Sequence, residues 1–167
     1  MTVANDDFKT GEFVVYPTHG VGQILGQENQ EIAGHEMSLF VIEFQEERMK
    51  LRVPTSSARK NGLRCLSSKK TMDDAMKKLK GRARVRRTMW SRRAQEYETR
   101  IKSGDPVSIA EVVRELYRNS TQPEQSYSER QIYQTALERL AREYAAIENM
   151  ELDDAAKKLE EIMSKAA

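Results

Sequence analysis

The stretch Gly11–Ile24, "GEFVVYPTHGVGQI", decides the fold of the first part of the chain. It opens with the β-branched and aromatic run EFVVYP, which a proline ends, and such runs are typical of β-strands. The segment THGVG follows with two glycines, as tight turns require. Alternating apolar residues resume directly after it. The pattern predicts a strand, a turn and a second strand.

Short strand-like runs continue as far as Leu66. SLFVIEF (Ser38–Phe44) is dense in β-forming residues, and the segment before it carries another turn glycine. In MKLRVP (Met49–Pro54) apolar and basic residues alternate, so the two kinds face opposite sides of a strand. Several short strands at a spacing of roughly ten residues, joined by glycine turns, indicate a small antiparallel β-barrel.

The periodicity becomes helical from Thr71 onward. Three segments resemble capping boxes, which begin helices with a serine or threonine and an acid or amide three residues later. They are TMDD from Thr71, SIAE from Ser108 and SERQ from Ser128. Gly104 and Pro106 are stop signals for the helical region before them. The acids of LDDAAKKLEEIM suit the first turn of a last short helix.

These stripes predict a helical bundle of four or five helices behind the barrel. The fold class expected is therefore α+β, with a small antiparallel barrel followed by an all-α bundle. We place the boundary near residues 67–70 and expect two domains, 1–68 and 69–167. A chain of 167 residues is long enough for two small domains.

Several kinds of chemistry have no candidate residues. The single cysteine, Cys65, excludes an internal disulfide and a multi-cysteine zinc site, and its apolar neighbours predict a buried structural thiol. His19 and His35 lie in expected turns without a nucleophile beside them. We therefore expect no enzyme activity, no cofactor and no metal site. The lack of a signal peptide and of a long apolar run predicts a cytoplasmic protein with no membrane partner.

Positive charge is concentrated in one part of the chain. The total is only +2, yet the segment from Lys77 to Lys102 holds eleven lysine or arginine residues against two acids. A solvated helix face usually alternates acids with bases at a spacing of four residues. This segment does not, and so it predicts a surface for a polyanion such as a nucleic acid.

Trp90, the only tryptophan, lies inside this basic segment. On a continuous helix it would align with Ala94, Tyr97 and Ile101, which makes it the head of a core stripe. Alternatively, Thr88 could act as an N-cap after a break, which would place Trp90 in a first helical turn. There an exposed ring could stack on or wedge against a base while arginines hold the backbone. The candidate nucleic-acid contacts are Trp90, Arg86, Arg87, Arg92 and Arg93.

Four segments carry a family resemblance. They are GEFVVYPTHGVGQI, MKLRVP followed by GLR, WSRR, and GDPVSIAEVVRELYR. In this order they resemble the motifs of the CarD/CdnL family of bacterial transcription regulators, over nearly the whole chain. The first half is also similar to the polymerase-interacting domain of transcription–repair coupling factors.

This resemblance implies a Tudor- or SH3-like barrel that docks on the RNA polymerase β subunit. The arginine of the family's RVP motif matches Arg52, and the strand around it adds Lys50, Val53 and Pro54 as expected polymerase contacts. Gln30 stands where the family has a second basic contact. From the residues alone, an exposed edge strand at 50–54 can also pair with a strand of a partner.

The resemblance further implies that the helical domain contacts promoter DNA at the upstream edge of the melted bubble. In the family a tryptophan wedges into the minor groove there, and Trp90 is the matching position, with Arg92 and Arg93 beside it. Gln95 stands where some members carry a lysine. We expect a monomer that reaches the nucleoid through RNA polymerase and binds free DNA weakly, without sequence preference.

Two other functions remain open on the sequence. The chain could be an RNA- or ribosome-binding adaptor, which would bind structured RNA without polymerase. It could also be a protein-protein scaffold with a basic docking face. DNA binding would differ from such a scaffold in its steep linear dependence of log affinity on log salt.

Overall fold

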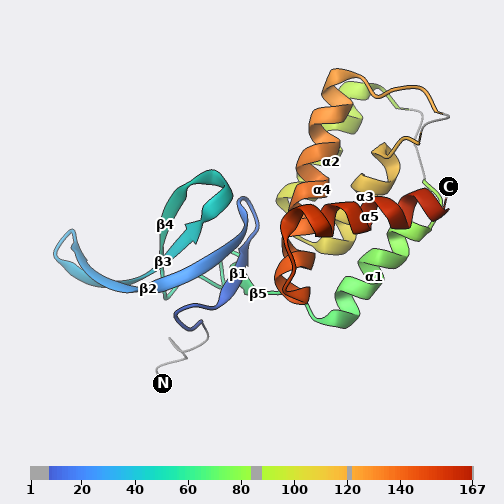
Figure 1. Ribbon diagram of the computed structural model, residues 1–167. Coiled ribbons are helices and arrows are strands. Elements are labelled where there is room, and N and C mark those ends of the chain that lie inside the picture. Colours follow the sequence, from blue (N-terminus) through green and yellow to red (C-terminus); the bar gives the residue numbers. More distant parts are fainter. Residues whose placement is uncertain (1–7, 84–87, 120–121, 167) are drawn as a thin grey trace. The chain divides into compact units, whose positions relative to one another are not determined.

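The protein is described by a computed structural model that covers residues 8–83, 88–119 and 122–166, without the side chain of Glu46. The chain divides into two compact units, and the boundary between them along the chain lies between Leu66 and Ser67. In the described residues the first unit holds five β-strands and the second holds five α-helices (Figure 1). The predicted α+β class, with strands first and helices after, is confirmed.

The first unit is one antiparallel sheet. Its strands are β1 (Phe13–Tyr16), β2 (Gly20–Ile32), β3 (His35–Phe44), β4 (Met49–Pro54) and β5 (Arg64–Cys65). Their order in the sheet is β4-β3-β2-β1-β5, so β4 and β5 form its edges within the described residues. The strongly bent strands curl around a single core (Figure 1).

Gly22 of the opening motif is required by packing. A Cβ atom built on Gly22 would lie 2.7 Å from Cγ2 of Ile42 and 2.8 Å from Cε1 of Phe44, closer than such atoms approach. Because Gly22 has no side chain, the two large residues of β3 can fill the core at this point. At the other end of the hairpin, Ala33 and Gly34 both have positive φ, 52° and 81°, as a two-residue hairpin turn demands.

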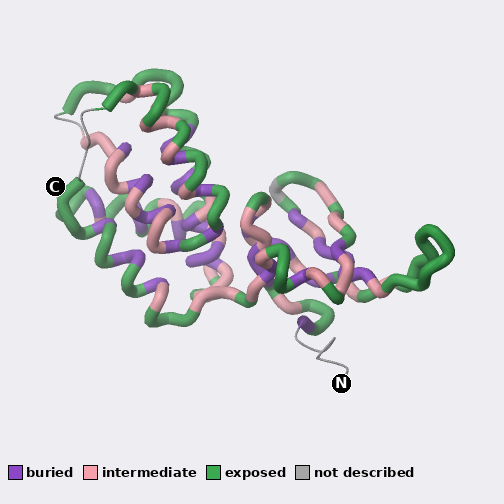
Figure 2. The backbone as a smooth tube through the Cα atoms, turned by 180° about the vertical axis from the view of Figure 1, so that it is seen from behind, coloured by how far each residue is buried: buried purple, intermediate pink, exposed green. Residues whose placement is uncertain are grey.

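The core of the sheet lies toward one end of its longest hairpin. Its buried residues are Phe8, Val14, Ile24, Phe40, Ile42, Phe44, Val53, Ala58 and Leu63. Beyond Gly26, where the β2–β3 register shifts, β2 and the start of β3 are largely exposed (Figure 2). The hairpin therefore extends as an arm past the hydrophobic core.

The second unit is a bundle of helices with its own core. The helices are α1 (Lys69–Lys80), α2 (Trp90–Lys102), α3 (Pro106–Leu116), α4 (Tyr127–Glu148) and α5 (Leu152–Ala166). Each helix buries one stripe, and α3 and α4 contribute the most buried residues. Completely buried side chains such as Leu140 and Leu159 join these stripes into one cluster.

Three helices begin earlier than their capping boxes predicted. The true N-caps are Ser68, Asp105 and Ser126, whose side chains accept hydrogen bonds from the backbone N–H groups of Thr71, Val107 and Glu129. The predicted caps at Thr71, Ser108 and Ser128 are wrong by two or three residues. At α3 the reason is plain, because Pro106 is preferred at the first helical position and leaves the carboxylate of Asp105 to cap.

Glu143 is a buried carboxylate in the C-terminal half of α4, and it is 4% exposed. Its Oε2 accepts a hydrogen bond of 2.8 Å from the backbone N–H of Ser67, at the start of the helical unit. A buried acceptor of this kind secures the backbone that leads into α1.

Cys65 was expected to be buried, and that prediction is wrong, because the residue is exposed. It lies on β5, a two-residue strand at the sheet edge, where apolar sequence neighbours do not imply burial. Its Sγ atom lies 3.4 Å from Oε1 of Glu12.

In the helical unit, none of the described helices is both long enough and apolar enough to cross a membrane.

Candidate functional site

The basic segment is broken between α1 and α2. α1 ends at Lys80, and the N–H of Gly81 bonds back to the carbonyls of Lys77 and Lys78. α2 begins at Trp90, with Met89 as an N-cap that makes no side-chain bond. The interpretation of one continuous helix is therefore wrong, and so is Thr88 as the cap. The alternative, Trp90 in a first helical turn, is confirmed.

Trp90 is half-buried, so the two predictions made for it are each partly right. Its ring packs against the hydrophobic cluster of the bundle, as the core-stripe interpretation required. The ring centroid lies 6.2 Å from that of Tyr97, at an angle of 52°. The residue is partly exposed at the start of α2. Trp90 thus combines packing against the core with partial exposure.

The two arginines that follow Trp90 differ in surroundings. Arg92 is exposed, and its side chain makes no bond to any residue the structure describes. Arg93 is half-buried, and its guanidinium carbon lies 5.5 Å from the centroid of Trp90 and 5.7 Å from that of Tyr97. Its Nη2 donates a hydrogen bond of 3.1 Å to the Tyr97 hydroxyl. The other two predicted DNA contacts, Arg86 and Arg87, lie outside the described residues.

Tyr97 joins this group to the core. It is 4% exposed, and burial raises the pKa of its hydroxyl, with Glu115 of α3 raising it further and Arg93 opposing the change. The hydroxyl therefore stays protonated at physiological pH. The helical periodicity predicted Tyr97 only as part of an apolar stripe and did not indicate its polar role, although the spacing of Trp90, Arg93 and Tyr97 is visible in the sequence.

Acidic residues of α3 neutralise part of the basic segment. Arg100 lies 3.7 Å from carboxylate oxygens of both Glu111 and Glu115, and Lys78 lies 3.7 Å from Glu111. The acids of α3 lie outside the basic segment of the sequence, so the free positive charge is lower than the composition of that segment predicted. The pairing was not predictable from spacing along one helix, because the partners lie on three helices.

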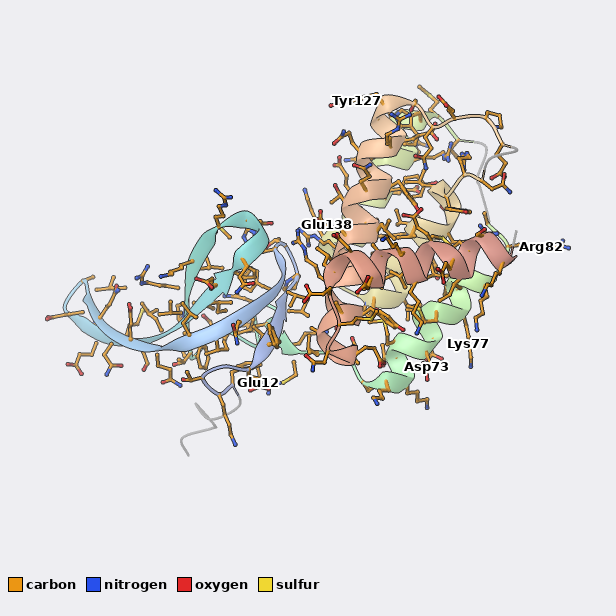
Figure 3. The ribbon with its side chains drawn as sticks, in the orientation of Figure 1. Glu12, Asp73, Lys77, Arg82, Tyr127 and Glu138 are labelled. Carbon is orange, nitrogen blue, oxygen red and sulfur yellow. The ribbon has the colours of Figure 1, made fainter. Side chains whose placement is uncertain are left out.

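A groove of about 1060 Å³ lies where α1, α2 and α3 meet. Its basic lining residues are Lys77, Lys78, Arg82, Arg100 and Arg114, and its acidic ones are Asp74, Glu111 and Glu115. Lys77 and Arg82 lie at the C-terminal end of α1 and just beyond it (Figure 3). The mixture of charges makes this surface less cationic than the sequence alone indicated.

Arg52 on β4 is held by a carboxylate from another strand. Its Nε lies 2.9 Å from Oε2 of Glu28, and both side chains are nearly half exposed. Glu28 belongs to β2, so the pair reaches across β3. The hydrogen bond from Arg52 is the main cause that lowers the pKa of Glu28. Sequence analysis missed Glu28, because nothing local links residues on strands that are not adjacent.

Gln30 also belongs to this group. Its Nε2 donates a hydrogen bond of 3.3 Å to the same Oε2 of Glu28. The residue that departs from the family pattern thus touches the carboxylate that orients Arg52. Gln30 and Arg52 act on one oxygen from two different strands.

The other predicted polymerase contacts on β4 are unlike one another. Lys50 is exposed and Pro54 is half-buried, whereas the side chain of Val53 is 3% exposed and packs inside the sheet core. The side chain of Val53 is therefore not available to a partner. The strand order leaves the outer backbone edge of β4 without a neighbouring strand in the described part of the chain.

Residues typical of metal sites do not gather in the parts described. No three His, Cys, Asp or Glu side chains among them are placed to hold a metal ion. His19 stacks on Tyr16 at 5.8 Å and lies 3.2 Å from a Glu47 carboxylate oxygen. Its surroundings are those of a turn residue.

Comparison with known proteins covers both units. The family description "CarD, C-terminal domain" matches residues 74–160, more than half of the chain. The description "CarD-like/TRCF RID domain", where RID stands for RNA polymerase-interacting domain, matches residues 8–67. A similar protein is "Putative transcription factor YdeB" of Bacillus subtilis (strain 168), 27% identical over 143 residues, which are 86% of this chain and 94% of that protein.

Proposed function

The chain belongs to the CarD family of transcription regulators, and on that premise we propose that it stabilises the open promoter complex. It is a transcription factor with an RNA polymerase-interacting domain, and regulators of this family are not enzymes. In the proposal, β4 binds the polymerase β subunit. The start of α2 contacts promoter DNA at the upstream edge of the bubble.

The observation that carries the DNA contact is the placement of Trp90. A wedge needs one side fixed to a rigid body and another side free to enter a groove. The half-buried ring at the first position of α2 meets both needs. Arg92, exposed two residues later, can reach a phosphate beside the wedge. Arg86 and Arg87 are proposed as further phosphate contacts on the sequence alone.

Support for the polymerase contact comes from the free edge of β4. A strand of the β subunit can add to this edge through the backbone groups of β4 that point away from β3. Arg52 and Lys50 lie on the face of β4 that points away from the core. The ion pair with Glu28 orients Arg52 before a partner binds. A preoriented guanidinium loses less conformational entropy when it binds an acidic partner.

Two weak contacts on one molecule reinforce each other through effective concentration. Binding to free DNA is therefore expected to be weak and without sequence preference, in the minor groove. Binding at a promoter depends on polymerase being there already. Tight site-specific binding by the isolated protein would contradict this arrangement, as would tight binding to structured RNA without polymerase.

The test is the lifetime of promoter open complexes formed by the cognate polymerase. We would compare no factor, wild type, Trp90→Ala and the matched control Tyr127→Ala. Tyr127 is also an aromatic residue at the first position of a helix in the same unit, and it is 77% exposed (Figure 3). Wild type and the control should lengthen the lifetime, and Trp90→Ala should not. A wild type that binds polymerase without changing the lifetime would refute the proposal.

A further inference from the structure

We propose that Arg93 is a positioning residue that holds the indole of Trp90, and that it does not itself bind DNA phosphate. The inference rests on the proposed function, in which Trp90 enters the groove, and it assigns different roles to two adjacent arginines. Arg92 is the phosphate contact and Arg93 is the clamp.

The clamp follows from spacing along α2. Arg93 lies three residues after Trp90 and four before Tyr97, so all three share one face of the helix. The guanidinium carbon is nearly equidistant from the two ring centroids, at 5.5 Å and 5.7 Å. Both distances are within the range of cation–π attraction, and arginine engages aromatic faces in this way more often than lysine does. One cation therefore bridges two rings.

The polar atoms of Arg93 are turned inward. Nη2 donates to the Tyr97 hydroxyl, and Nε is buried and finds no acceptor among the described residues. A guanidinium that binds phosphate needs these N–H groups to be accessible and forked toward the ligand. Arg92 meets that requirement because it is exposed, whereas Nη2 of Arg93 donates to Tyr97 and its Nε is buried.

Tyr97 gives the clamp a fixed base. It is almost fully buried, and Glu115 on α3 is one of the groups that raise the pKa of its hydroxyl. Glu115 in turn lies 3.7 Å from Arg100 of α2. A series of contacts thus runs from Trp90 through Arg93 and Tyr97 to a neighbouring helix, and it ties the first turn of α2 to the core.

Such support matters because no side chain in the described part of the chain caps the start of α2. Met89, the N-cap, makes no side-chain hydrogen bond to the first turn. A wedge that moved freely would lose rotamer entropy when it entered the groove, and this loss would weaken binding. The contacts of Arg93 restrict the indole before DNA binds, so less conformational entropy is lost in the binding step.

Tryptophan fluorescence tests the clamp without DNA, since Trp90 is the only tryptophan. The variants are Arg93→Gln and the control Arg92→Gln, which make the same change in charge one residue apart. Arg93→Gln should raise the acrylamide quenching constant of Trp90, and Arg92→Gln should leave it at the wild-type value. Equal quenching in wild type and Arg93→Gln would overturn the proposal.

Salt dependence of DNA binding separates the two roles. Affinity for a fluorescent fork-junction duplex is measured over a series of low salt concentrations. Arg92→Gln should reduce the slope of log affinity against log salt by about 0.9, the value for one phosphate contact. Arg93→Gln should lower the affinity and leave the slope unchanged. A slope reduced as in Arg92→Gln would make Arg93 a phosphate contact instead.

Two further variants keep the proposal testable if Arg93→Gln fails to fold. Arg93→Lys keeps the charge and loses the planar group, and Tyr97→Phe keeps the ring and loses the hydroxyl acceptor. Both should raise the quenching of Trp90, and wild-type quenching in both would refute the clamp. If wild type binds polymerase without lengthening the open-complex lifetime, the proposed function fails, while quenching still decides what holds Trp90.

Discussion

The edge strand β4 and the first turn of α2 each present an arginine that its own unit holds in place, by different chemistry. Arg52 is held by the carboxylate of Glu28, whereas Arg93 is held by the rings of Trp90 and Tyr97. A carboxylate compensates the charge of its arginine, but aromatic rings do not. A protein can therefore hold a cation in a fixed orientation without neutralising its charge.

The two sites also differ in their relation to a hydrophobic core. The Arg52–Glu28 pair lies on the solvent face of the sheet, and exposed ion pairs contribute little to stability. The α2 group is continuous with the core of the bundle through Tyr97 and Trp90. Changes at β4 should therefore alter binding alone, while changes at α2 should alter binding and stability together.

The largest effect is expected from Trp90→Ala. Loss of a stacking or wedging ring corresponds to about 1–3 kcal/mol, or roughly 5- to 150-fold in open-complex lifetime. Because the ring is half-buried, the variant should also lose about 1–2 kcal/mol of unfolding free energy, less than for a buried aromatic residue. Promoter kinetics and denaturant unfolding measure the two effects. An unfolded helical unit would instead make Trp90 a core residue.

Glu143→Ala should separate stability from binding within the helical unit. Removal of the buried acceptor leaves the Ser67 N–H without this partner and should cost about 1–3 kcal/mol of unfolding free energy. Glu143→Gln keeps an acceptor and should cost less. Open-complex lifetime at saturating folded protein should match wild type for both variants. A shortened lifetime would show that stability loss alone can mimic loss of the wedge.

Arg52→Glu should weaken polymerase binding by about tenfold or more, because it places a second carboxylate beside Glu28 and reverses the charge offered to the partner. The thermal midpoint should stay near the wild-type value. Surface plasmon resonance with the polymerase β subunit measures the affinity. Lys60→Glu, an exposed reversal in the same unit but outside β4, serves as the control. Equal affinities for the two variants would remove Arg52 from the interface.

The smallest effect concerns the pH dependence of the Arg52–Glu28 pair. The pKa of Glu28 is lowered in the folded state, chiefly by the hydrogen bond from Arg52. Its contribution to stability is therefore present above the unfolded value, about pH 4.3, and is lost as pH falls through the lower folded value. Calorimetry should find Glu28→Gln slightly less stable than wild type at neutral pH, with the difference vanishing in acid. A difference that persists in acid would rule out the charge as its cause.

Much of the fold was predictable because it depends on local patterns. MKLRVP alternates with a period of two, and β4 occupies Met49–Pro54 with its apolar residues more buried than its basic ones. Helix starts were less well predicted. Several capping residues occur close together before each helix, and only the packing of the helix decides which of them the backbone uses.

The sequence indicated candidate site residues but not the residues that contact them. Trp90 and Arg52 were visible through motif and composition. Glu28 was not, because the strand register that places it beside Arg52 is set by the pairing of β2 with β3 and of β3 with β4. Similarly, Arg100 and Glu111 meet only because α2 and α3 pack together.

The sequence by itself determined the order of the two units, the strand and helix periods and the position of a lone tryptophan in a basic segment. Those features depend on residues near one another in the chain, whose spacing sets which side chains share a face. Only the tertiary structure decided which arginine is free and which is held. Burial and ion pairing arise between residues distant in sequence, and their free energies depend on distances that no linear pattern contains.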